Sequence, residues 1–246
     1  WRALALQGAK GGEDDLEAYG SPIVATLEGV KQVVVNTVKG LAGVDARSGE
    51  PLWLVGVDRG DVDAPNVTPA LWNRQADHLV LTTTESSGSP LFRITKAGRE
   101  WNAEEVWRSK VSGNMASPVV AGDHAFLPLK NGRVALLDLS NGKEAWISKP
   151  LFASYASAVR RDDRVLLLTA DGELHLLATD QTQLRKLGVL KVAERTWAHL
   201  AAQDDRVYVR SQSSLIALEW VTSRRREPRA EEVAEGGSKA GFPAGH

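Results

Sequence analysis

The chain has no cysteine among its 246 residues. Disulfides, thiolate catalysis and cysteine-based zinc sites are therefore excluded, although this absence names no cellular compartment. No apolar run reaches the roughly 20 residues that a transmembrane helix needs. The net charge of −1 gives no electrostatic basis for binding nucleic acid or an anionic membrane surface. We therefore expect a globular protein with no transmembrane segment and no nucleic-acid partner.

Sequence motifs of the common enzyme classes are also missing. There is no G-x-S-x-G, no P-loop and no dinucleotide-binding fingerprint. Four of the five histidines are spread along the chain without the spacing of a metal site: His78, His124, His175 and His199. His175 alternates with Leu174 and Leu176, so we expect it to face outward from a strand. The sequence predicts no metal site and no catalytic residue.

An internal repeat is the main feature that the chain does contain. The segment that runs from Ser21 to Trp53 returns from Ser117 to Trp146, with the same order of β-runs, Asp, Gly turn and closing Trp. Aligned on the opening residue, five units begin at Ser21-Pro22, Thr68-Pro69, Ser117-Pro118, Ser157-Ala158 and His199-Leu200. A spacing of about 40 to 49 residues is the length of one four-stranded propeller blade.

The periodicity inside each unit is that of β-strands. Runs such as KQVVVNTV (31–38) and RVLLLTA (164–170) are short, β-branched or leucine-rich, and bounded by Gly or Asp. Asn131-Gly132 and Asp171-Gly172 predict type I′ hairpins, with positive φ at both positions. Asp45 and Asp138 are placed to accept backbone N–H bonds in further turns. These patterns predict an all-β propeller of four-stranded antiparallel blades, with about five units present.

A tryptophan closes most units, and we expect these side chains to fill the wedges between adjacent blades. The closing residues are Trp53, Trp107, Trp146 and Trp220, and the fourth unit lacks its tryptophan near Leu187. Trp1 resembles the closing residue of a preceding unit. We therefore expect the chain to begin at a blade boundary, with its true N-terminus and any export signal upstream. We therefore interpret these tryptophans as residues of the hydrophobic core.

The chain divides into two parts by composition. Residues 1–220 carry the repeats and are expected to form the propeller. Residues 221–246 have few large apolar side chains and many Gly, Pro and charged residues, so we expect a disordered C-terminal tail.

The repeat resembles that of the quinoprotein, or PQQ-like, β-propellers. LAGVDARSGEPLW (41–53) and VALLDLSNGKEAW (134–146) are the best matches, and LIALEW (215–220) is a truncated copy. DGELHLL (171–177) and TWAH (196–199) are similar to segments of bacterial PQQ-binding-like repeat proteins. Such propellers usually have seven or eight blades. The resemblance implies that these five units are the C-terminal part of a larger ring.

This family contains both enzymes and non-enzymatic proteins, namely PQQ-dependent alcohol and sugar dehydrogenases and an outer-membrane assembly lipoprotein. The dehydrogenases are expected to carry calcium ligands from Glu, Asn and Asp, an Asp base and often a cysteine pair. The cysteines are absent here, and no matching constellation is found on these repeats. The weak calcium candidates are Asp58, Asp61 and Asp63, which lie in one predicted loop. The alternative interpretation is a solvent-exposed connection that binds no calcium.

One constellation suggests a binding site. The residues two before each unit start are Tyr19, Asn66, Met115, Tyr155 and Trp197. Equivalent positions in a propeller form a ring, here at the mouth of the central funnel. Aromatic side chains around one opening can stack against a flat ligand or a peptide. The alternative is packing between neighbouring blade tops.

The leading interpretation is a non-enzymatic binding or assembly scaffold in the bacterial cell envelope. The propeller funnel would bind a protein or small-molecule partner, and a periplasmic location follows from the family resemblance. The alternative is the C-terminal half of a PQQ- and calcium-dependent alcohol or sugar dehydrogenase, with its calcium ligands and base upstream. In that case the cofactors would be PQQ and calcium.

Overall fold

The computed structural model describes residues 18–58, 66–74, 77–113, 115–153 and 155–219. In this part of the chain, strands form five antiparallel sheets, each from consecutive strands. The strands are β1 (Ile23–Leu27), β2 (Val30–Thr37), β3 (Gly40–Asp45), β4 (Pro51–Val55), β5 (Ala70–Arg74), β6 (Asp77–Leu81), β7 (Ser89–Ala97), β8 (Glu100–Ser109), β9 (Val119–Ala121), β10 (His124–Pro128), β11 (Val134–Asp138), β12 (Glu144–Ile147), β13 (Ala156–Arg161), β14 (Arg164–Thr169), β15 (Glu173–Ala178), β16 (Arg185–Lys191), β17 (Ala201–Gln203), β18 (Arg206–Arg210) and β19 (Leu215–Glu219).

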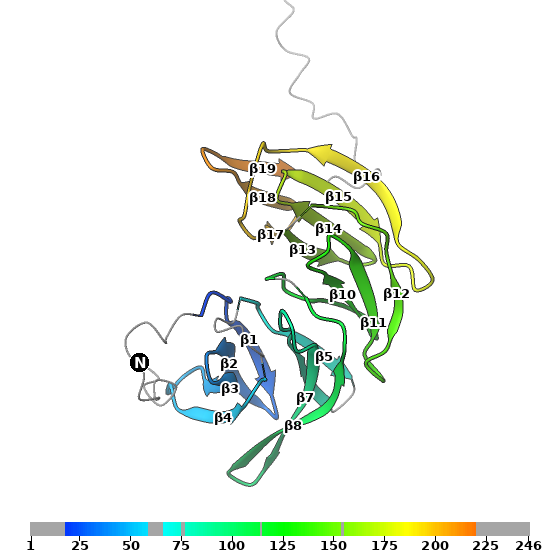
Figure 1. Cartoon of the computed structure of the whole chain (residues 1–246). Helices are drawn as coiled ribbons and strands as arrows, with labels where there is room; N and C mark the ends of the chain where they lie inside the picture. Colours follow the sequence, from blue (N-terminus) through cyan, green and yellow to red (C-terminus); the bar gives the residue numbers. More distant parts are fainter. Residues whose placement is uncertain (1–17, 59–65, 75–76, 114, 154, 220–246) are drawn as a thin grey trace, which may run out of the picture.

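The predicted fold class is confirmed. The first four sheets have four strands each and the fifth has three. Four of the unit starts predicted from the sequence lie directly before the first strand of a sheet, and Ser157-Ala158 lies within β13. The sheets follow one another along an arc, with β12 and β16 on its outer side and β13 and β17 on its inner side (Figure 1). First strands also contact each other from sheet to sheet, β5 with β9 and β9 with β13. These features are those of consecutive propeller blades.

The hydrophobic core lies between the sheets and is divided into four clusters. Val80 and Phe92 of the second sheet pack with Val34 and Trp53 of the first. The later clusters join the second and third sheets, the third and fourth, and the fourth and fifth in the same way. The inner strands of the second, third and fourth sheets are therefore covered on both faces, since each of these sheets has a described neighbour on either side.

Indole side chains cross the outer part of these wedges. The indole N–H of Trp107 donates to the carbonyl of Leu139 in the next sheet (2.9 Å). The indole N–H of Trp146 donates to the backbone carbonyl of Asp180 (3.0 Å). The Trp107 ring also packs against Gly142, where a Cβ would lie 2.6 Å from the indole. Trp53 differs, since its N–H bonds Gln32 within its own sheet (2.7 Å). Trp53 is the more buried side chain, whereas Trp107 and Trp146 are half-buried.

Aspartates organise the turns as predicted. Asp45 Oδ1 accepts the N–H groups of Arg47 (2.8 Å) and Ser48 (2.7 Å), and Asp138 Oδ1 accepts that of Ser140 (2.8 Å). These bonds favour the ionised carboxylate. Accordingly, backbone hydrogen bonds from Ser48 and Arg47 lower the pKa of Asp45.

The turn type predicted for the two glycine hairpins is wrong, although the hairpins form. Positive φ occurs at Gly132 (72°) and Gly172 (77°) but not at Asn131 or Asp171. At the first hairpin the loop spans residues 130–132, and the Leu129 N–H donates to the Arg133 carbonyl (2.8 Å). A wider loop needs only one left-handed residue, so glycine alone carries it.

The outward orientation expected for His175 is also wrong. Its side chain is buried, with a relative exposure of 1%. Alternation along β15 could not show this, because neighbouring sheets cover both faces of the inner strands. Burial lowers the pKa of His175, with a smaller contribution from Lys186.

Several sequence predictions fall outside the described residues. They concern Trp1, Trp220, Asp61, Asp63 and the tail at 221–246. The boundary between propeller and tail therefore stays a prediction. Among the described residues, no helix is long and apolar enough to cross a membrane.

We predict that Trp53→Ala lowers the free energy of unfolding by about 3–5 kcal/mol, because it leaves a cavity between the first two sheets. Urea denaturation measures this change. Leu54→Ala is the matched control: Leu54 is the next residue and 46% exposed, and its truncation should cost less than about 1 kcal/mol. Equal losses for the two variants would contradict the proposed role of Trp53.

Candidate functional site

The five predicted ring residues all lie in the connection just before the first strand of their sheet. Their surroundings differ. Tyr19 is 63% exposed, whereas the half-buried Asn66 donates from Nδ2 to Glu85 Oε1 (3.0 Å). Met115 is half-buried and has a positive φ of 40°. The structure brings the other two, Tyr155 and Trp197, into direct contact.

Hairpin glycines fix the path of the connections that carry Tyr155 and Trp197. The Gly132 carbonyl accepts the N–H groups of Leu151 (2.7 Å) and Phe152 (3.2 Å). One sheet further on, the Gly172 carbonyl accepts those of Val192 (2.9 Å) and Ala193 (3.2 Å). A Cβ on Gly132 would lie 1.8 Å from the Phe152 oxygen. The repeat therefore needs glycine here for both its φ and its close backbone approach.

Hydroxyl groups at the unit starts link neighbouring sheets. Ser157 Oγ accepts the Leu200 N–H (3.0 Å), and Ser117 Oγ accepts the Thr68 N–H (3.0 Å). Ser117 and Ser157 thus hold the backbone just before the first strand of an adjacent sheet, and the Ser157 bond fixes the connection that follows Trp197.

Three aromatic side chains form the centre of the candidate site. The rings of Tyr155 and Trp197 stack with centroids 6.2 Å apart and planes 19° apart. His199 meets Tyr155 edge-on, with a centroid distance of 6.1 Å. Tyr155 is 7% exposed and Trp197 is 60% exposed. The buried tyrosine thus supports an indole that remains open to a partner.

Burial sets the ionisation of this cluster. Desolvation raises the pKa of Tyr155 from 10.0 to about 12, and the Ser157 hydroxyl opposes this shift. Desolvation also lowers the pKa of His199. Both groups are therefore neutral near pH 7, and the cluster offers aromatic surface rather than charge.

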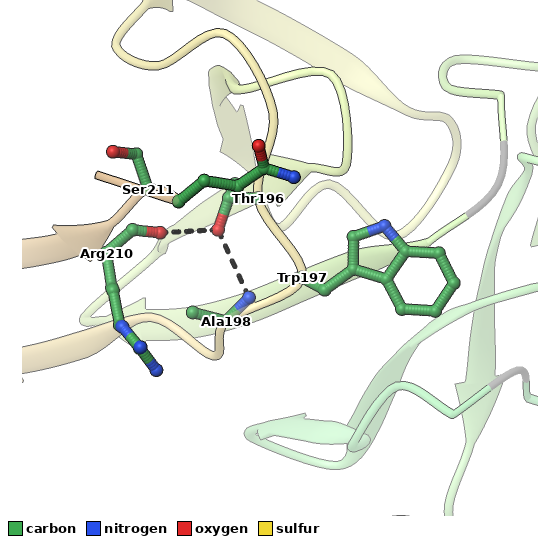
Figure 2. A pocket seen from close by; sticks show the side chains of 6 residues that line it. Thr196, Trp197, Ala198, Arg210 and Ser211 are labelled. Carbon is green, nitrogen blue, oxygen red and sulfur yellow. Dashed lines mark hydrogen bonds between the residues drawn. The ribbon is translucent and has the colours of Figure 1, made fainter. Parts of the chain in front are cut away.

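A cavity of about 420 Å³ adjoins the exposed indole. Its lining comes from the connection before β17 and the loop after β18: Thr196, Trp197, Ala198, Arg210, Ser211 and Gln212. Thr196 Oγ1 donates to the Arg210 carbonyl (2.5 Å) and accepts the Ala198 N–H (3.1 Å). Figure 2 shows these bonds, with Trp197 projecting away from Arg210 and Ser211. Trp197 is therefore held between two anchored neighbours.

Sequence reasoning missed the residues that complete this site. His199 stands two positions after Trp197, Arg210 is the last residue of β18, and Ser211 and Gln212 begin the loop that follows it. The loop between the second and third strands of a blade lies at the same end of the sheet as the connection entering the first strand. That topological rule would have pointed to residues 210–212.

A second cavity, of about 530 Å³, lies between the second and third sheets. Glu85, the partner of Asn66, lines it together with Lys110, Leu129 and Ile147. The predicted position Asn66 thus adjoins a separate cavity.

The weak calcium candidates are not brought together in the described part of the chain. Asp58 is exposed in the connection after β4, and Asp61 and Asp63 fall outside that part. The described residues contain no group of three or more His, Asp or Glu placed to hold a metal ion.

We predict that the Tyr155 phenol titrates near pH 12, measured by phenolate absorbance as the difference between the wild type and Tyr155→Phe. Because the folded state retains a proton that the unfolded state loses from about pH 10, this group's contribution to stability falls as pH rises from 10 to 12. Trp197→Ala should shift the titration toward pH 10. An unshifted titration in Trp197→Ala would show that the indole does not shield the phenol.

Comparison with known proteins gives one family and several structures of similar fold. A family model described as the outer membrane protein assembly factor BamB matches residues 2–226. No curated protein sequence matches the chain.

Three solved structures illustrate the similarity. The computationally designed Ika8 protein has 13% identity and a TM-score of 0.58, with 88% of this chain and 61% of that chain covered. BamB from Moraxella catarrhalis has 18% identity and a TM-score of 0.52, with coverages of 83% and 61%. BBS1N, in complex with ARL6DN, has 12% identity and a TM-score of 0.58, with coverages of 85% and 62%.

At these identities the likeness to the solved structures concerns the fold. The chain spans about three fifths of the length of each of these structures. The family model, in contrast, covers most of the chain. This protein therefore belongs to the PQQ-like family of the outer membrane protein assembly factor BamB.

Proposed function

We propose that this protein is a non-enzymatic scaffold of the bacterial cell envelope that binds a protein partner through its loop face. The family match supports an envelope assembly role, since the model is described as an outer membrane protein assembly factor. Two of the similar structures, BamB and BBS1N, are propeller relatives, and BBS1N was solved in complex with ARL6DN. We further propose that the five sheets are part of a ring of seven or eight blades, located in the periplasm.

The observation that carries this proposal is the exposed, supported indole of Trp197. A large aromatic side chain that is 60% exposed yet stacked on a buried tyrosine is already ordered before a partner arrives. Little side-chain entropy is then lost on binding, and tryptophan is enriched among residues that dominate interface energies. The adjoining cavity offers Arg210 and the polar groups of Ser211 and Gln212 as rim contacts.

The quinone-dependent dehydrogenase remains the alternative proposal. Calcium prefers several carboxylate and carbonyl oxygens. None of the described residues that line the cavity beside Trp197 is a carboxylate: the polar side chains there belong to Thr196, Arg210, Ser211 and Gln212. These residues do not fit a calcium–quinone pair, and we derive no catalytic step from them. Titration of the whole protein with PQQ and calcium, followed by absorbance and heat, tests this alternative.

The scaffold proposal predicts that Trp197→Ala weakens binding to a purified outer-membrane protein assembly complex by at least about tenfold, since hot-spot residues contribute 2 kcal/mol or more. Biolayer interferometry measures this change. The melting temperature should stay close to that of the wild type, because the side chain is mostly exposed.

Leu54→Ala provides the control, because Leu54 is an exposed apolar residue on β4 of the first sheet. It should bind like the wild type. If Trp197→Ala bound normally, or if it lost affinity only together with a large loss of stability, the indole would be a packing residue and the proposed site would be wrong.

A further inference from the structure

The outer strand of the fourth sheet, β16, differs from the other outer strands in its exposure and its charge. Like β4, β8 and β12 it ends its sheet, and among the described strands it pairs with β15 alone. All of its residues except Gly188 are exposed. They include three large apolar side chains, Leu187 (41% exposed), Val189 (50%) and Leu190 (56%). An edge strand of this length presents unpaired backbone groups that can pair with another chain.

The missing tryptophan explains why the apolar side chains of this strand are exposed. Trp53, Trp107 and Trp146 of the preceding sheets lie in their fourth strands and fill the outer part of the wedge. β16 carries no tryptophan, and a Cβ built on Gly188 meets nothing within 4 Å. A register shift opposite Leu176 and Leu177 makes Leu187 an extra residue in the strand. The apolar side chains of β16 therefore border open space.

The charge of β16 is also distinctive. It contains three cationic residues and no acidic residue: Arg185, Lys186 and Lys191. None of these three forms a salt bridge with a carboxylate among the described residues, although the Lys191 amino group bonds the Asp171 carbonyl. β8, in contrast, is acidic, and two of its glutamates pair with Arg93 and Arg108.

Cations on an edge strand disfavour pairing with a second copy of the same edge, because like charges would face each other. The same cations favour a strand that carries carboxylates. We propose that β16 is a β-augmentation site for an extended partner segment in which apolar and acidic residues alternate. Backbone hydrogen bonds would give affinity, and the three cations would select the partner. This surface goes beyond the proposed function and does not involve Trp197.

The test uses a fluorescent synthetic peptide of alternating valine and glutamate, matched in length to β16, and measures its anisotropy with the full chain. We expect saturable binding that weakens as salt is raised toward physiological ionic strength. Hydrogen exchange should slow over residues 185–191. A peptide with lysine in place of glutamate should not bind, and one N-methylated along one edge should lose binding because it lacks the backbone donors.

Charge reversal provides the matched variants. Lys186→Glu with Lys191→Glu should weaken binding of the acidic peptide by about tenfold and transfer the preference to the lysine peptide. Lys143→Glu with Lys149→Glu makes the same change in net charge on exposed residues flanking β12. That variant should bind the acidic peptide like the wild type.

Several results would overturn the proposal. They include no binding of the acidic peptide, equal loss in both charge-reversal variants, full binding of the N-methylated peptide, and self-association that Lys186→Glu abolishes. The alternative occupant of β16 is the chain's own acidic segment, residues 227–235. If replacing Glu231, Glu232 and Glu235 with Gln strengthened peptide binding by about tenfold or more, that segment would occupy β16 and the proposed partner would not.

Discussion

Burial of apolar surface between neighbouring sheets is the constraint on which this structure depends. The four core clusters each join two consecutive sheets, so the second, third and fourth sheets bury apolar side chains on both faces. No sheet is therefore a stable unit by itself. The indoles of Trp107 and Trp146 add a hydrogen bond across the outer part of the same interface. This shared core holds the connections between sheets in fixed positions.

The proposed function depends on the side chains that this stacking leaves exposed on the loop face. Glycine carbonyls and serine hydroxyls hold the connections before the fourth and fifth sheets at several backbone N–H groups. Tyr155 is buried by that arrangement, and Trp197 is presented on top of it. A rigid aromatic surface beside a polar cavity is the feature on which the proposed recognition of a protein segment rests.

The repeat allowed the architecture to be predicted, since spacing, strand pattern and the turn aspartates Asp45 and Asp138 are local properties of the chain. The orientation of His175 could not be predicted, because alternation along a strand indicates one buried face and neighbouring sheets cover both. The site was predicted in part. The repeat register predicted the positions of Tyr155 and Trp197. It could not predict that Arg210 lies beside Thr196, because that contact depends on how the fifth sheet packs against the connection that leads into it. The exposed apolar surface of β16 was indicated in the sequence only by the missing closing tryptophan of the fourth unit.

The most direct test of this account is amide hydrogen exchange of the whole protein with and without a purified outer-membrane protein assembly complex. The account predicts slower exchange at residues 196–198 and 210–212 when the complex is bound, with the inner strands unchanged. Protection confined to the opposite end of the sheets, where the β1–β2 and β9–β10 hairpins lie, would contradict the proposed site. No protection at any residue would contradict it as well.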